Sequence, residues 1–221
     1  MVNLFLLDTR APGITVPTHA FVRACLAACS SHDPAAFVFA RGPLGKPEIR
    51  APRDAEPLHF NVSKTHELVV CAVARGHGLG VDVEYLTRNV RMLDIAHRYF
   101  APEEARALAR LPCPVRAFHA LWTLKEAYAK GLGLGLTMPL DRCTFDIASD
   151  GQVDTRKTPC GDWQFGLWTP TPEHVLALAL PCEAGPIDVR FHRFKLQAMP
   201  KNADHPWTIA PAPRAPMEAR W

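Results

Sequence analysis

Short apolar segments that we interpret as strands are scattered among helical stretches, without a regular alternation of the two. A doubly wound parallel sheet requires strand and helix to alternate, so this irregular order favours an α+β fold. The second helical stretch is interrupted at Pro102, which suits the first turn of a new helix. The predicted helices span residues 17–31, 91–110 and 114–131, and the predicted strands span residues 2–7, 36–39, 68–74, 79–84, 143–147, 163–168 and 175–180.

Composition narrows the class of protein further. The 221 residues are 48% hydrophobic, enough to bury a core without disulfides, and Lys and Arg exceed Asp and Glu by only 25 − 22 = 3. No apolar run approaches the roughly 18–20 residues that cross a bilayer, and no basic residue precedes the N-terminal apolar run as in a signal peptide. The seven cysteines show no C-x-x-C spacing, which is typical of reduced thiols and not of a zinc site. We therefore expect a cytoplasmic protein that binds neither nucleic acid nor membrane.

Two segments half a chain apart resemble each other. Residues 66–72 and 173–179 both consist of a polar lead-in followed by a buried strand. Chance similarity between apolar strands and a duplicated two-lobe architecture both explain this resemblance. From about Lys195 onward the chain is rich in proline, and we expect an extended tail there.

Asp82 and Glu84, in the segment G-L-G-V-D-V-E, are the first candidates for a functional site. Residues i and i+2 of a strand point to the same face, so the two carboxylates project together. Paired carboxylate oxygens suit Mg²⁺, which takes one or two carboxylates together with waters and phosphate oxygens. The alternative is the solvent-exposed face of an edge strand.

Trp122, Glu126 and Lys130 are spaced i, i+4 and i+8 on the third predicted helix and share one face. In a functional interpretation Glu126 is a third metal ligand and Lys130 binds a phosphate. In the plainer interpretation, which spacing alone favours, Trp122 packs in the core and the Glu–Lys pair stabilises the helix.

Two further segments carry groups that bind phosphate. Asn61, Ser63 and Lys64 directly precede the strand predicted over 68–74, and we interpret them as a phosphate-contacting turn or as a simple Asn/Ser turn. Lys46 lies in a Gly- and Pro-rich turn that would ordinarily be a plain loop.

The order of these motifs is more specific than any one of them. G-K-P, F-N-x-S, G-V-D-V-E, R-Y-F-x-x-E-E and W-T-x-K-E-x-x-x-K-G-x-G-x-G-L follow one another over residues 15–180. This order resembles the 4'-phosphopantetheinyl transferases of the broad-specificity, surfactin-synthetase-activator type. The resemblance implies an enzyme that moves the phosphopantetheine arm of coenzyme A onto a serine of an apo acyl or peptidyl carrier protein and releases 3',5'-ADP.

The resemblance also implies roles for individual residues. Asp82, Glu84 and Glu126 match the Mg²⁺ ligands, and Glu126 matches a general base for the carrier serine. Lys130 matches a lysine that contacts the phosphates, and is catalytic in this interpretation. Positions that contact the coenzyme in relatives are matched by Thr15, Lys46, Ser63, Lys64 and Lys130.

The implied fold consists of two similar α+β lobes related by a pseudo-two-fold axis, with the active site in the cleft between them. We place the N-terminal lobe at 1–85, the C-terminal lobe at 86–194 and the tail at 195–221, and we expect a monomer. The carrier is expected to dock near residues 99–104 and Lys125.

Two departures from the family pattern keep a second hypothesis open. Lys64 stands where the family has histidine, and few residues precede Thr15, so the contact to the coenzyme's 3'-phosphate is unassigned, with Arg10 and Arg23 as candidates. A non-catalytic relative that binds coenzyme A or a carrier protein is therefore the alternative. A metal-dependent phosphohydrolase is a third possibility.

Overall fold

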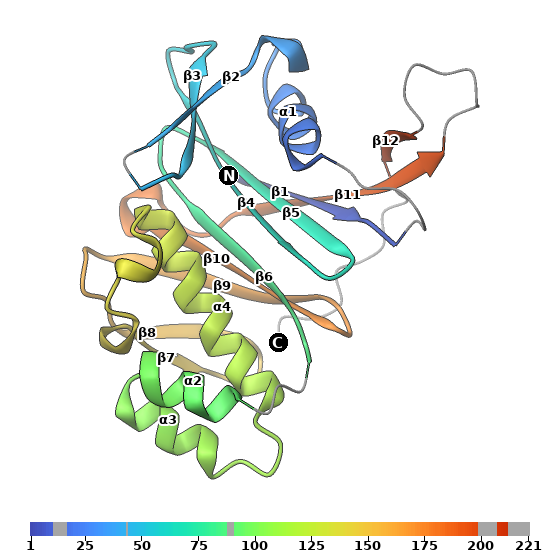
Figure 1. Ribbon diagram of the computed structural model, residues 1–221. Helices are drawn as coiled ribbons and strands as arrows, with labels where there is room; N and C mark the ends of the chain where they lie inside the picture. Colours follow the sequence, from blue (N-terminus) through green and yellow to red (C-terminus); the bar gives the residue numbers. More distant parts are fainter. Residues whose placement is uncertain (11–16, 43, 88–90, 199–206, 212–221) are drawn as a thin grey trace.

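The computed structural model describes residues 1–10, 17–42, 44–87, 91–198 and 207–211. Figure 1 shows the arrangement of its helices and strands. The helices are α1 (Thr18–Ala28), α2 (Met92–Tyr99), α3 (Pro102–Ala109) and α4 (Val115–Leu132). The strands are β1 (Val2–Asp8), β2 (Val38–Arg41), β3 (Pro47–Ala51), β4 (Leu58–Thr65), β5 (Leu68–Arg75), β6 (Gly80–Tyr85), β7 (Thr144–Ile147), β8 (Val153–Lys157), β9 (Trp163–Thr171), β10 (His174–Pro181), β11 (Val189–Ala198) and β12 (Trp207–Pro211).

One topology occurs twice along the chain. Strands β1, β5 and β4 lie in that order in one sheet, and β6, β10 and β9 lie in the equivalent order in a second, with antiparallel pairing throughout. Each set also contains a helix after its first strand and a small hairpin, β2–β3 or β7–β8. The α+β prediction and the prediction of two similar lobes are confirmed.

The internal sequence resemblance now has a structural explanation. Residues 66–72 lead into β5 and residues 173–179 lead into β10, and these are the central strands of the two equivalent sets. Both strands are covered on both faces, so each reads as a continuous apolar run.

The two sheets pack against each other and carry their helices on the outside, α1 on one and α4 on the other (Figure 1). Successive residues of each central strand point to opposite faces of its sheet. On β10, Leu176 and Leu178 join the core between the sheets, whereas Val175 and Ala177 face α4.

The C-terminal strands extend the first sheet. β11 pairs in parallel with β1, and β12 pairs with β11, giving the order β12-β11-β1-β5-β4. The lobe boundaries predicted at residues 85 and 194 remain predictions. Two strands, however, form their hydrogen bonds with the set of strands that belongs to the other lobe. β6 pairs with the second set, and β11 pairs with the first.

The helix predictions agree with the structure to within a few residues. The break at Pro102 is confirmed, and Ala101 N–H donates to Glu104 Oε2 at 3.1 Å at the start of α3. The strands that the sequence analysis did not predict are β3, β4, β8, β11 and β12. No helix in the described parts of the chain is both long and apolar enough to span a membrane.

Helix α4 approaches β6 so closely that glycine is required at the contact. A Cβ atom on Gly80 would lie 1.9 Å from the carbonyl oxygen of Ala127 and 2.4 Å from the amide nitrogen of Gly131. Both are backbone atoms of α4, so the helix itself would have to move. The absence of a side chain at Gly80 therefore sets how closely α4 lies over β6.

We predict that Gly80→Ala lowers stability by about 3 kcal/mol, the upper part of the range for overpacked cores. For a chain of this size that corresponds to a fall in Tm of about 6–12 °C. Thermal unfolding followed by circular dichroism measures the change. Gly78→Ala is the matched control, since a Cβ atom there has no neighbour within 4 Å; equal Tm values for the two variants would contradict this account.

Candidate functional site

Ser63, Asp82 and Lys130 form a cluster that joins the two lobes. Lys130 Nζ donates to Asp82 Oδ1 at 2.6 Å and to Ser63 Oγ at 2.9 Å, and Ser63 Oγ donates to Asp82 Oδ1 at 2.8 Å. Ser63 comes from β4, Asp82 from β6 and Lys130 from α4. The Asp82 side chain is only 4% exposed, so the ammonium group of Lys130 compensates a carboxylate that has lost its water.

Strand β4 contributes more than Ser63 to this junction. Asn61 Oδ1 accepts a hydrogen bond from Val81 N–H at 2.9 Å, and Thr65 Oγ1 accepts one from Tyr85 N–H at 3.2 Å. Side chains at positions i, i+2 and i+4 of β4 therefore bond to β6, which belongs to the other sheet. The prediction of a turn at Asn61, Ser63 and Lys64 is wrong, because all three residues lie within β4, where Asn61 and Ser63 contact β6.

Glu84 and Glu126 add negative charge beside the cluster. Burial is the main cause that raises the pKa of Glu84 to about 7, the charge of Asp82 raises it further, and Lys130 and the Trp122 indole lower it. Burial and then Asp82 also raise the pKa of Glu126, against the opposing effect of Lys130. Three carboxyl groups thus share one lysine in a partly desolvated site.

The donor set suits a hard divalent cation. Asp82 Oδ2 and Glu126 Oε1 are buried and have no hydrogen-bond partner among the described residues. Carboxylate oxygens are the ligands that Mg²⁺ prefers, and a cation would satisfy both atoms. The geometry is not preassembled, since no group of three His, Cys, Asp or Glu side chains in the described parts of the chain could hold a metal ion as placed. Lys130 instead contacts Asp82.

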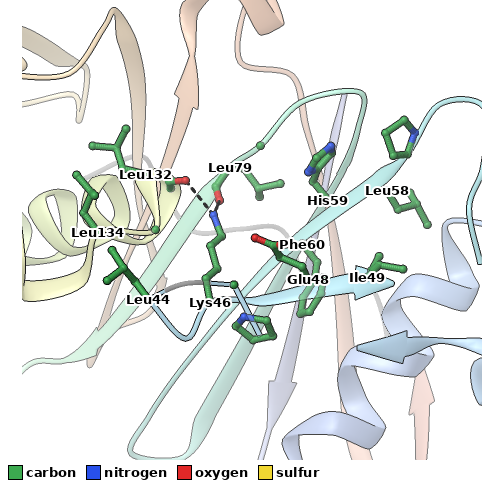
Figure 2. A pocket seen from close by; sticks show the side chains of 16 residues that line it. Leu44, Lys46, Glu48, Ile49, Leu58, His59, Phe60, Leu79, Leu132 and Leu134 are labelled. Atoms are coloured by element: carbon green, nitrogen blue, oxygen red, sulfur yellow. Dashed lines mark hydrogen bonds between the residues drawn. The ribbon is translucent and has the colours of Figure 1, made fainter. Parts of the chain in front are cut away.

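Lys46 crosses from the first lobe to the C-terminal end of α4. Its Nζ donates to the carbonyl oxygens of Gly131 at 2.9 Å and Leu79 at 3.3 Å, as Figure 2 shows. A cation near the last carbonyls of a helix is electrostatically favourable. Burial lowers the pKa of Lys46, and the charge of Glu48 raises it.

A pocket of about 550 Å³ surrounds Lys46 (Figure 2). Its walls come from the β2–β3 hairpin, the start of β4, the residues just before β6, and the end of α4, so both lobes contribute. The lining residues are Gly42, Leu44, Lys46, Pro47, Glu48, Ile49, Pro57, Leu58, His59, Phe60, Gly78, Leu79, Gly131, Leu132, Gly133 and Leu134.

Other predicted contact residues are not brought to the cluster. Lys64 is exposed and follows Ser63 on β4, so its side chain points to the opposite face. Arg10 pairs with Asp8 at 2.6 Å, and Arg23 donates to the carbonyl oxygens of Pro34 and Ala35. Thr15 lies outside the described residues.

The predicted docking role of Lys125 is wrong. Its side chain is fully buried and its Nζ lies 2.7 Å from Glu104 Oε2, so a partner protein has no access to it. Of the neighbouring segment 99–104, Phe100, Ala101 and Glu104 are also buried. Sequence spacing did not reveal this, because lysine is mostly exposed on helices unless a partner from another element pairs with it.

We predict that Glu84→Gln stabilises the metal-free protein much more at pH 8 than at pH 5. The folded-state pKa of about 7 lies above the ordinary 4.5, so the folded state binds the proton more tightly and stability falls as the pH rises from 4.5 through 7. Removing the charge abolishes that loss; each 1 kcal/mol relieved raises Tm by about 2–4 °C. Thermal unfolding at both pH values measures this change in stability.

The control is Glu183→Gln, which replaces an exposed carboxyl group on the 3₁₀ turn Cys182–Ala184. A stabilisation by Glu84→Gln that is equal at pH 5 and pH 8 would refute the prediction.

Comparison with known proteins gives a consistent result. Residues 78–179 match the family model of the 4'-phosphopantetheinyl transferase superfamily. A Bacillus subtilis 4'-phosphopantetheinyl transferase is 36% identical over 134 residues, covering 60% of this chain and 57% of the relative. The transferase HetI of Nostoc is 40% identical over 95 residues, covering 42% of this chain and 40% of the relative. The transferase Sfp of Bacillus subtilis is 34% identical over 117 residues, covering 52% of this chain and 50% of the relative.

These matches extend over part of each protein. The chain spans about half the length of the curated relatives it matches. Among solved structures, a holo-[acyl-carrier-protein] synthase from Neisseria meningitidis aligns with a TM-score of 0.40 at 21% identity, covering 47% of this chain and 95% of that one. The matched segment contains β6 and α4, and therefore Asp82, Glu84, Glu126 and Lys130. The chain is thus similar to the 4'-phosphopantetheinyl transferase superfamily over residues 78–179, the segment that matches its family model.

Proposed function

We propose that this protein transfers the 4'-phosphopantetheine arm of coenzyme A to a serine of an apo acyl or peptidyl carrier protein and releases 3',5'-ADP, with Mg²⁺ as cofactor. The observation that carries the proposal is the cluster of Ser63, Asp82 and Lys130 at the junction of the lobes. Glu84 and Glu126 lie beside it, and the similar proteins described above are named as 4'-phosphopantetheinyl transferases.

Asp82, Glu84 and Glu126 would hold the metal. Two of their buried oxygens lack partners, and their combined charge exceeds what Lys130 alone compensates. Mg²⁺ supplies charge compensation for a pyrophosphate, which three carboxylates without a cation would repel.

Lys130 and Glu126 carry the remaining chemistry of the proposal. The carrier serine oxygen forms a bond to the phosphorus that bears the pantetheine arm, and the bond from that phosphorus to the oxygen of 3',5'-ADP breaks. Lys130 donates to the phosphate oxygens and stabilises their charge. Glu126 accepts the proton of the serine hydroxyl, and its raised pKa suits a general base.

The pocket around Lys46 is the proposed site for the nucleotide end of the coenzyme. Its volume of about 550 Å³ lies within the range of small-molecule sites. Lys46 uses two of its three N–H donors on backbone carbonyls, which leaves one for the ligand. Ser63, Lys64 and Thr15 remain proposed coenzyme contacts from the family resemblance.

Partner and location complete the proposal. The carrier protein and coenzyme A are the expected partners, and we propose a cytoplasmic monomer. All seven cysteines, each within the described ranges, are free thiols, which suits a reducing compartment.

We predict that Glu126→Gln lowers transfer at least about 100-fold, because the variant loses both the proposed base and a metal ligand. Intact-mass measurement of an apo carrier protein, incubated with the enzyme, coenzyme A and Mg²⁺, reports the gain of one phosphopantetheine arm. EDTA should abolish the gain for the wild type. Glu183→Gln is the matched control and should transfer at the wild-type rate.

Other outcomes of the same measurement identify the alternatives. An unmodified carrier, together with calorimetric binding of coenzyme A, would indicate the non-catalytic relative. Cleavage of coenzyme A without modification of the carrier would indicate a phosphohydrolase. Full activity of Glu126→Gln would exclude the role given to this residue.

A further inference from the structure

Lys125 is a fully buried cation next to Glu126 in sequence. Its Nζ contacts Glu104 Oε2 at 2.7 Å, and it donates to the carbonyl oxygens of Leu140 at 2.9 Å and of Cys143. An ammonium group has three donors, so these three acceptors satisfy it completely. The rings of Phe100 and Phe145 lie 5.1 and 5.8 Å from the same nitrogen.

Glu104 is equally well satisfied. Its Oε2 accepts from Ala101 N–H at 3.1 Å, and its Oε1 accepts from Phe145 N–H at 3.2 Å. The pair therefore connects the start of α3, the 3₁₀ turn Leu140–Arg142, and β7 to the middle of α4.

Stability does not explain why this pair is ionic. Desolvation of two charges offsets most of their attraction, and apolar replacements of buried ion pairs are often neutral or stabilising. Three directional contacts do, however, tie Lys125 of α4 to Glu104, Leu140 and Cys143, and Glu104 is itself held by the backbone N–H groups of Ala101 and Phe145.

Rotation of α4 matters because the functional side chains follow directly in sequence. Glu126 is one residue from Lys125, about 100° around the helix, and Lys130 is five residues from it. A rotation of α4 about its axis at Lys125 therefore turns Glu126 and Lys130 by the same angle. The 2.6 Å contact between Lys130 Nζ and Asp82 Oδ1 depends on that angle.

We propose that the Lys125–Glu104 pair is a positioning device that sets the rotation of α4 and so aims Glu126 and Lys130 at Asp82. The kinetic part of this inference rests on the proposed function, whereas the geometric part does not. Lys125 and Glu104 act through other residues and touch no reacting atom.

The test is the double variant Lys125→Met with Glu104→Gln. It removes both charges together, keeps similar volumes, and retains an amide oxygen to accept a backbone N–H bond. We expect a folded protein whose kcat falls at least tenfold while its KM for coenzyme A changes less than threefold. Leu26→Ala, in α1 of the other lobe, is the control for a general loss of stability and should keep its kcat.

A crystal structure of the double variant tests the geometry independently of activity. We expect the distance from Lys130 Nζ to Asp82 Oδ1 to exceed hydrogen-bonding range, about 3.5 Å. Retention of the 2.6 Å contact would overturn the proposal, as would an unchanged kcat in an active protein. If the wild type shows no transfer, the proposed function fails while this distance still decides the positioning role.

A milder variant covers the case in which the double variant does not fold. Glu104→Asp keeps both charges and shortens the acid by one methylene, so it pulls Lys125 without leaving a charge unpaired. We expect the same kinetic change as in the double variant but of smaller magnitude, with kcat at least threefold lower and KM for coenzyme A nearly unchanged. Wild-type kcat and a wild-type contact between Lys130 and Asp82 in this variant would overturn the proposal.

Discussion

The contact between Lys130 and the buried carboxylate of Asp82 is the interaction on which the rest of the site depends. Asp82 is 4% exposed and sits where the two sheets meet, so its charge requires compensation. The compensating cation comes from α4, and the accompanying hydroxyl of Ser63 comes from the first lobe. One buried charge thereby fixes the relative placement of β4, β6 and α4.

Several features of the fold serve this contact. Gly80 lets α4 approach β6 closely enough for Lys130 to reach Asp82. Asn61 and Thr65 bond to the β6 backbone across the junction and hold β4 beside it. Lys46 bonds to the end of α4 from the first lobe. The junction between the two lobes is therefore held by polar contacts. A small change in any of these contacts shifts the side chains of the site.

Local patterns in the sequence predicted much of this arrangement. Strand periodicity placed Asp82 and Glu84 on one face, and helical spacing placed Glu126 and Lys130 on one face of the helix that lies over it. The resemblance between residues 66–72 and 173–179 agreed with a duplicated architecture, and the structure shows them at equivalent central strands. These features follow from the side-chain periodicity of a single helix or strand, which can be recognised in the sequence.

Contacts between elements were the ones that local patterns missed. The segment from Asn61 to Lys64 was predicted as a turn because its polar residues suit turns, whereas the partners of Asn61 and Ser63 lie on β6, some 20 residues later. Lys125 reads as an exposed helix residue because Glu104, which permits its burial, lies on another helix. Burial of a charged side chain depends on such partners from other elements, and a local sequence pattern does not predict that burial.

In the proposed function, Asp82, Glu84 and Glu126 form a cation site that acts together with the coenzyme pocket. Calorimetric titration of coenzyme A into the protein, with Mg²⁺ and with EDTA, measures this coupling. We expect Mg²⁺ to strengthen binding to the wild type at least tenfold and to have no such effect on Asp82→Asn. Equal affinity of the wild type with Mg²⁺ and with EDTA would show that no such cation site exists.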